Sequence, residues 1–164
     1  MKKISILGII VVVICCSFYT TLFPAGKDES LVPYPEGYRE WTHIKTAVVE
    51  PGHPAFKGFG GFHQIYANKK AMDGYRSGYF ADGSIIVFDV LKAIDTSRLL
   101  LEGVRKQLDV MVKDSASYRS TGGWGFEEFS GDSKTDRTVK GLAVTTCFSC
   151  HSTTKTLVFS QWRK

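Results

Sequence analysis

Hydrophobic and polar residues alternate along several stretches of the chain, which is the pattern of half-buried β-strands. The stretches that predict strands are residues 41–49, 62–67, 84–90, 104–113 and 122–129. A short helix is predicted over residues 69–76, because Asn68 can cap its start and Gly78 follows its end. A second short helix is predicted around residues 143–154. The pattern therefore predicts a mainly β fold, an antiparallel sheet domain with two short helices.

The alternation is most regular in the predicted strand over residues 104–113. One set of alternate residues is Val104, Lys106, Leu108, Val110 and Val112. The other set is Arg105, Gln107, Asp109, Met111 and Lys113. A strand places two such sets on opposite faces of its sheet.

Residues 1–26 have the composition of a targeting or anchoring segment. Two lysines precede residues 4–23, an apolar stretch of 20 residues without a charge. A basic start and an apolar run are typical of a secretory signal peptide, and the run is also long enough to span a bilayer as one helix. Residues 12–15 only loosely resemble a lipoprotein box. A cleaved signal peptide, a retained membrane anchor and a lipid anchor stay open, and each predicts that residues 27–164 form an exported domain.

Length, charge and cysteine placement limit the classes of protein to which the chain can belong. The chain has 164 residues, which is enough for one domain with a hydrophobic core. Its formal net charge is +5, with Lys2 and Lys3 at the extreme N-terminus and the other basic residues spread among acidic ones. No nucleic-acid partner is expected from so even a distribution. The four cysteines lie in two places, Cys15–Cys16 and Cys147/Cys150, which is not a disulfide framework.

Cys147, Cys150 and His151 form a C-x-x-C-H motif, the attachment signature of c-type haem. On one helical turn, each sulfur can form a thioether to a haem vinyl group and the adjacent imidazole can ligate the iron. A redox C-x-x-C pair is disfavoured because its usual βαβ setting is missing. A zinc site would need a further ligand from another segment, for which the histidines are His43, His53 and His63. The motif, on the C-terminal predicted helix of an exported chain, favours one covalently bound haem c with His151 as the axial iron ligand.

The position of the motif favours an open distal site. Only 13 residues follow His151 and none of them is methionine, so a downstream methionine ligand is excluded. The upstream candidates for a sixth ligand are His43, His53, His63, Met72, Met111, Lys69, Lys70, Lys92 and Lys113. Each is better explained as a core, strand or surface residue. The second ring nitrogen of His151 is expected to bond a backbone carbonyl or an acceptor side chain.

Several segments together resemble the cytochrome P-460 family, which includes the cytochrome c′-beta branch. These segments are Tyr38–Trp41, Tyr66–Asn68, Ala81–Val87, Met111–Asp114, Thr121–Phe126 and Cys147–His151. Only the C-x-x-C-H motif is specific by itself, whereas the order and spacing of the segments are specific together. The resemblance covers nearly all of residues 41–162. It implies a β-sheet cytochrome, usually a homodimer, with a pentacoordinate, histidine-ligated haem.

The same resemblance bears on the distal pocket. Members that oxidise hydroxylamine have a lysine bonded to the haem macrocycle and a pocket glutamate on a later strand. Phe88 aligns with that lysine here, and residues 110–114 contain no glutamate. The c′-beta branch has a phenylalanine-capped pocket, for which this chain offers Phe88 with Phe59 (or Phe62). The alternative is that these phenylalanines belong to the ordinary core.

Three functional hypotheses follow for a periplasmic protein. The first is a mono-haem c-type cytochrome whose open site binds small gaseous ligands, above all nitric oxide. The second is oxidation of hydroxylamine or nitric oxide by a P-460-type haem, which needs a base within reach. The third is an electron-transfer cytochrome whose iron is closed by Met111, Met72 or His63. The expected partners are a second copy of the chain and a redox partner protein, with membrane contact only through the N-terminal segment.

Overall fold

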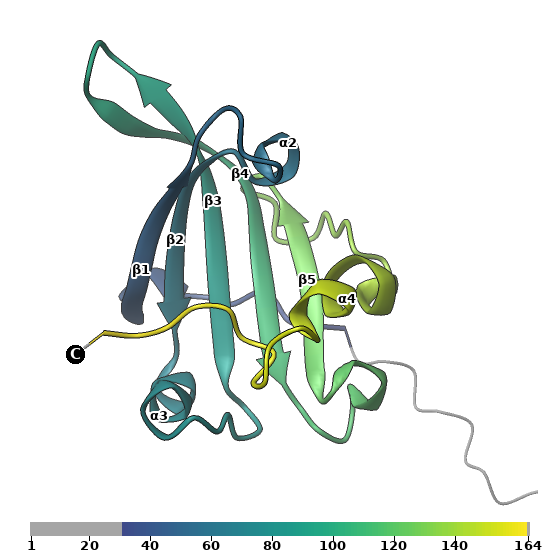
Figure 1. Cartoon of the computed structure of the whole chain (residues 1–164). Helices are drawn as coiled ribbons and strands as arrows, with labels where there is room; N and C mark the ends of the chain where they lie inside the picture. The colour runs from purple at the N-terminus through teal and green to yellow at the C-terminus, as the bar shows by residue number, and fades with distance from the viewer. Residues whose placement is uncertain (1–30, 164) are drawn as a thin grey trace, which may run out of the picture.

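The fold is built on one sheet of five antiparallel strands, arranged β1-β2-β3-β4-β5 in chain order (Figure 1). The computed structural model describes residues 31–163. The strands are β1 (Thr42–Val49), β2 (Gly61–Ala67), β3 (Ile85–Asp95), β4 (Leu100–Lys113) and β5 (Trp124–Ser130). The predicted mainly β, antiparallel fold is therefore confirmed. β3 and β4 run beyond their predicted ends and form a hairpin that projects past the rest of the sheet (Figure 1).

The helices are short and lie near the ends of strands. α3 (Lys69–Ser77) is the first predicted helix, and its start is capped by the Asn68 side chain, which accepts a hydrogen bond from the Ala71 amide at 2.9 Å. The second predicted helix is a π-helical turn, η3 (Val144–Phe148), that continues into α4 (Ser149–His151). The elements that the pattern did not predict are η1 (Tyr38–Glu40), α2 (Phe56–Phe59) and η2 (Arg119–Thr121). Each is too short to leave a periodic signal.

The sheet carries a hydrophobic cluster on each face. On one face, here called the N-terminal face, residues 31–41 pack against central-strand residues such as Val87 and Leu108. On the other, here called the cavity face, α3 and the C-terminal residues 139–162 pack against residues such as Ile65. Figure 1 shows the C-terminal segment crossing in front of the strands and the N-terminal segment passing behind them. Alternating side chains on the strands supply both faces.

β4 contains a bulge at Lys106. The prediction of regular alternation over residues 104–113 is therefore wrong at this position. The pairs that flank it are Val90 with Gln107 and Leu91 with Arg105. Lys106 is therefore an extra residue on β4, and such a residue shifts the alternation beyond it. As a result, Arg105 lies on the N-terminal face, with its Nε 2.6 Å from Asp89 Oδ1, instead of sharing a face with Gln107.

The predicted signal peptide or membrane anchor, residues 1–26, lies outside the described residues, as does its boundary with the exported domain. Within residues 31–163, no helix is long and apolar enough to cross a membrane.

Candidate functional site

A cavity of about 560 Å³ lies between the cavity face of the sheet and the C-terminal segment. This volume is within the range of about 300–1,000 Å³ that is typical of small-molecule and cofactor sites. Its apolar lining from the sheet includes Ile65, Ile86, Phe88, Met111 and Phe126. Its lining from the C-terminal segment includes Cys147, Cys150, His151, Val158 and Phe159. An apolar cavity with a few polar groups is the usual form of a cofactor site.

The C-x-x-C-H motif lies on the C-terminal wall of this cavity. Cys147 belongs to η3, whereas Cys150 and His151 belong to α4, and the continuous helical backbone brings all three to the same side. All three side chains line the cavity, and both cysteines are free thiols. Burial raises the pKa of the Cys147 thiol above its ordinary value. The residues predicted from the motif are thus gathered at one wall.

His151 is held in a defined orientation by the backbone. Its Nδ1 lies 2.7 Å from the Leu157 carbonyl oxygen, so the hydrogen bond predicted for the second ring nitrogen is present. Because a carbonyl oxygen only accepts, Nδ1 carries the proton and Nε2 of the neutral ring keeps a free lone pair. Burial lowers the pKa of His151, although the bond to Leu157 acts in the opposite direction. The neutral ring is the form that binds a metal ion.

The turn that presents the Leu157 carbonyl has a backbone conformation that is rare for a residue with a side chain. Leu157 has φ 63°, in the left-handed region, which costs about 1–2 kcal/mol. Gly122 lies directly against it, and a Cβ atom at Gly122 would come within 2.6 Å of Leu157 Cδ1. The strained backbone conformation is therefore at Leu157, the residue whose carbonyl orients His151. Backbone strain of this kind is common at functional sites.

Phe88 and Phe59, the two residues for which the resemblance implies a capped pocket, both line the cavity. Phe88 projects from β3 and Phe59 ends α2, with the ring centroids 6.3 Å apart in an edge-to-face arrangement. Phe62, the alternative to Phe59, is not a lining residue, because it precedes cavity-lining His63 on β2 and points to the other face. The two lining rings offer no hydrogen-bond donor.

His63 lies against both of these rings. Its centroid is 4.5 Å from that of Phe88 and 6.4 Å from that of Phe59. Its Nε2 is hydrogen-bonded to the Phe59 carbonyl oxygen, and Nε2 must be the donor. Burial lowers the pKa of His63, against the opposing effect of this bond. Nε2 of His63 is thus bonded to the backbone of α2.

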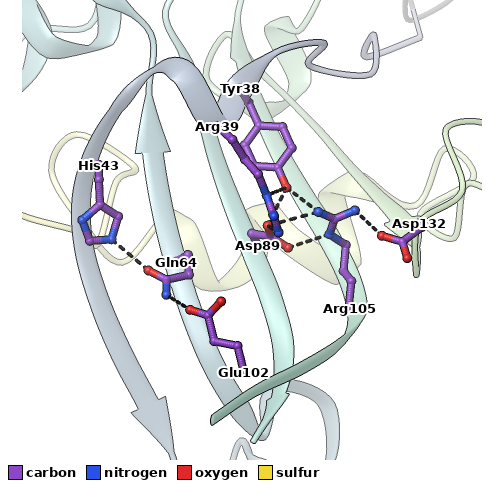
Figure 2. Close-up of polar contacts among 8 residues, drawn as sticks. All are labelled: Tyr38, Arg39, His43, Gln64, Asp89, Glu102, Arg105 and Asp132. Carbon is purple, nitrogen blue, oxygen red and sulfur yellow. Dashed lines mark hydrogen bonds and ion pairs between the residues drawn. The ribbon is translucent and has the colours of Figure 1, made fainter.

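The other residues considered as a sixth ligand divide into two groups. His53 and Met111 line the cavity. The residues that do not line it are His43, Met72, Lys69, Lys70, Lys92 and Lys113. His43 is exposed on β1, with its Nε2 2.9 Å from Gln64 Oε1 (Figure 2). Among the described residues, no lysine or arginine lines the cavity.

The zinc alternative receives no support from the arrangement of ligands. Within residues 31–163, no group of three or more His, Cys, Asp and Glu side chains is placed to hold a metal ion. His43, His53 and His63 therefore do not complete a ligand set with the two cysteines of the motif.

Carboxyl groups also line the cavity, and the sequence reasoning missed them. Asp109 on β4 and Glu128 on β5 are cross-strand partners. Gln107 Nε2 lies 3.2 Å from both carboxyl oxygens of Asp109 and 3.1 Å from Glu128 Oε2. Burial, together with the charge of Glu128, raises the pKa of Asp109 to about 8. The cavity consequently contains a carboxyl group that can exchange a proton near neutral pH.

The signal that could have located Asp109 was the alternation along β4. Asp109 and Met111 belong to the same alternate set, so a cavity containing Met111 should contain Asp109 as well. Residues 110–114 indeed contain no glutamate, but the carboxyl group lies one position before that window and on an aspartate.

The fold and the cavity define a class of protein in which one antiparallel sheet and a C-terminal C-x-x-C-H segment enclose a cavity of the size of a cofactor site. The sequence matches the family model of cytochrome P460 over residues 35–160, so the chain belongs to the cytochrome P460 family. Cytochromes of this family bind haem, and the chain is accordingly a haem protein. A comparison with curated proteins found no match.

The residues of the cavity fit a haem group. The largely apolar lining suits the macrocycle, and the free Nε2 lone pair of His151 suits its iron. The thiols of Cys147 and Cys150 lie beside that imidazole on the same wall. These three residues would hold the group.

Proposed function

We propose that the chain is an exported cytochrome with one haem c, bound covalently through Cys147 and Cys150 and ligated by His151. We further propose that its distal site binds small uncharged ligands, above all nitric oxide, as in the c′-beta branch. The observation that carries the proposal is that one cavity joins the motif to Phe88 and Phe59, while no lysine of the described residues lines it.

The chain's own residues would act by orientation and exclusion. A bound haem would supply the iron atom that binds a small ligand. His151 is pre-oriented by Leu157, so its Nε2 needs no rearrangement to serve as ligand. Phe88 and Phe59 keep water out of the distal space and give a polar ligand no hydrogen bond. These features favour nitric oxide over dioxygen, because dioxygen becomes polar when it is bound and the two rings offer it no hydrogen bond.

Asp109 supports hydroxylamine oxidation as a second candidate function. Oxidation of hydroxylamine releases protons and needs a base within reach. With a pKa raised to about 8 by burial and by Glu128, this carboxyl group exchanges a proton near neutral pH, and its ionised form would be the base. Among residues 31–163, no lysine lines the cavity to form a cross-link to the macrocycle, which is why ligand binding is the leading proposal.

An optical spectrum of the ferrous protein, with and without nitric oxide, tests the leading proposal. The expected result is a high-spin, five-coordinate spectrum that changes on addition of nitric oxide. A low-spin, six-coordinate spectrum that nitric oxide leaves unchanged would contradict it and favour an electron carrier. In that case Met111→Leu should convert the spectrum to high spin, because Met111 is a cavity-lining thioether.

Turnover of hydroxylamine distinguishes the second candidate. Steady turnover with an artificial electron acceptor that is lost in Asp109→Asn would favour the oxidase. Absence of turnover in the wild-type protein, together with binding of nitric oxide, would favour the ligand-binding protein.

The proposal also places the protein in the periplasm as a homodimer that exchanges electrons with a redox partner protein. Residues 1–26 support export through their basic start and uncharged run. Cell fractionation tests the location, and the mass of the native protein in solution tests the dimer.

A further inference from the structure

Three consecutive backbone carbonyls of the segment that carries Phe59 are held by side chains from the sheet. Lys106 Nζ donates hydrogen bonds to the Gly58 and Gly60 carbonyl oxygens, at 3.1 and 3.0 Å. His63 Nε2 donates to the carbonyl oxygen of Phe59, which lies between them. The two side chains thus fix the backbone on both sides of the Phe59 ring.

The bulge in β4 explains why a lysine reaches this position. Lys106 is the extra residue of the bulge, and a bulged strand can direct a side chain away from the direction set by alternation. With regular alternation, Lys106 would share a face with Leu108, which is completely buried on the N-terminal face. The bulge instead lets Lys106 extend to α2, at the end of the sheet where β1 leads into β2 (Figure 1).

Besides these hydrogen bonds, the segment around Phe59 is held by the local backbone hydrogen bonds of one helical turn and by the ring contacts of Phe59 with Phe88 and His63. α2 has four residues, and a helix of one turn is not stable by itself. Two of the residues in and after it, Gly58 and Gly60, are glycines, which lose the most conformational freedom when they are ordered. Phe56 and Phe59 each remain 39% exposed. The placement of Phe59 over the cavity therefore depends strongly on the hydrogen bonds from Lys106 and His63.

We propose that Lys106, together with His63, is a positioning residue that holds Phe59 over the cavity and thereby sets the rate at which small ligands enter. The inference rests on the proposed function, because it requires a ligand that reaches the cavity past Phe59. Lys106 itself does not line the cavity, and so it acts through the backbone of α2.

The test is the association rate of carbon monoxide with the ferrous holoprotein, measured after flash photolysis. Lys106→Met keeps the apolar stem but loses the donor. It should raise the rate roughly tenfold, because hydrogen bonds from a charged group of this kind shift a two-state equilibrium by about that factor. Lys106→Arg also offers several donors and should restore the wild-type rate. The matched control is Lys70→Met, which removes another lysine–carbonyl bond, to Asp82 at 3.1 Å, without touching α2.

A double-mutant cycle shows whether Lys106 acts through Phe59. Phe59→Ala alone should raise the association rate, and adding Lys106→Met should then change the rate no further. An unchanged rate in Lys106→Met, or equal effects of Lys106→Met with and without Phe59, overturns the inference. Faster amide hydrogen exchange over residues 56–60 in Lys106→Met, but not in Lys106→Arg, is expected as well, and unchanged exchange also overturns it.

These outcomes are separate from failure of the proposed function. A wild-type protein that contains haem but binds neither nitric oxide nor carbon monoxide refutes the proposed function and, with it, the role of Lys106 in ligand entry. A wild-type protein that binds both, with a rate insensitive to Lys106, refutes only the positioning role.

Discussion

Two aspartates on neighbouring strands, Asp89 on β3 and Asp109 on β4, lie on opposite faces of the same sheet and have opposite electrostatic environments. Asp89 is completely buried on the N-terminal face, and Tyr38, Arg39 and Arg105 all hydrogen-bond to it (Figure 2). Burial would raise the pKa of Asp89, but these hydrogen bonds lower it below its ordinary value. Burial raises the pKa of Asp109 to about 8, because no cation pairs with it among the described contacts.

The difference assigns a structural role to one face and a chemical role to the other. On the N-terminal face, the Asp89 cluster joins residues 31–41 to the sheet, and Arg105 extends it to Asp132 near the surface (Figure 2). A paired carboxylate of this kind is fixed in its charged form. On the cavity face, Asp109 keeps a proton that it can exchange, next to the space that a haem would fill. Perturbed groups of the second kind are characteristic of functional sites.

Removing the buried cation should strongly destabilise the fold. Arg105→Met leaves Asp89 charged and buried with only one arginine, and the free energy of unfolding should fall by about 3–5 kcal/mol. Its matched control is Arg39→Met, whose side chain is 57% exposed and which should cost about 0–1 kcal/mol. Chemical denaturation of the two holoprotein variants measures the difference. Equal losses would show that the Asp89 cluster is not the structural anchor described above.

Asp109→Asn should change the pH dependence of stability. The folded state holds a proton on Asp109 that the unfolded state releases above its ordinary pKa of 3.8. Between that value and about 8, wild-type stability should therefore fall as pH rises, relative to Asp109→Asn, by up to about 1.4 kcal/mol per pH unit. Above pH 8 the difference should be constant. Denaturation curves at roughly pH 5, 7 and 9 measure it, because the first two lie within the expected fall and the third lies above it.

Glu128→Gln sharpens the same test. Removing the neighbouring charge should bring the pKa of Asp109 down, so the fall in stability should end at a lower pH than in the wild type. Parallel curves for the wild type and Asp109→Asn would mean that Asp109 is ionised normally in the folded protein, and the contrast with Asp89 would disappear.

The regular part of this architecture follows from sequence pattern, whereas the features that break the pattern do not. Alternation located all the strands of the sheet to within a few residues, and Asn68 correctly marked the start of α3. The bulge at Lys106 could not be predicted from the sequence, because a bulge is fixed by pairing with β3 and not by local composition. The prediction that Arg105 shares a face with Gln107 was consequently wrong.

The part of the candidate site that a motif specifies was predictable from the sequence. The part that depends on the tertiary structure was not. The spacing of Cys147, Cys150 and His151 predicted their shared wall, and Phe88 was identified through family resemblance. The pairing of Asp109 with Glu128 depends on the register of β4 and β5, which no local pattern contains. Lys106 likewise contacts residues that lie 46 and 48 positions away in the sequence, and no local pattern predicts these contacts.

A smaller effect on stability, but a clear effect on ligand entry, is expected from Phe88→Ala. The ring lines a cavity and is only partly buried, so the loss should be about 1–2 kcal/mol and the association rate of nitric oxide should rise. Leu108→Ala is the matched change on the N-terminal face, where full burial predicts a loss of about 2–5 kcal/mol with the association rate unchanged. Denaturation and stopped-flow binding provide the two readouts. If Phe88→Ala behaves like Leu108→Ala in both, Phe88 is an ordinary core residue.

The intact mass of the purified protein after denaturation tests the central claim most directly, namely that the cavity face holds one haem attached through the C-x-x-C-H motif. Denaturation removes a haem bound only through His151, whereas thioether bonds to Cys147 and Cys150 survive it. The account predicts a mass equal to the processed polypeptide plus one haem, and the bare polypeptide mass for the double variant Cys147→Ala/Cys150→Ala. A wild-type mass equal to the bare polypeptide would contradict it.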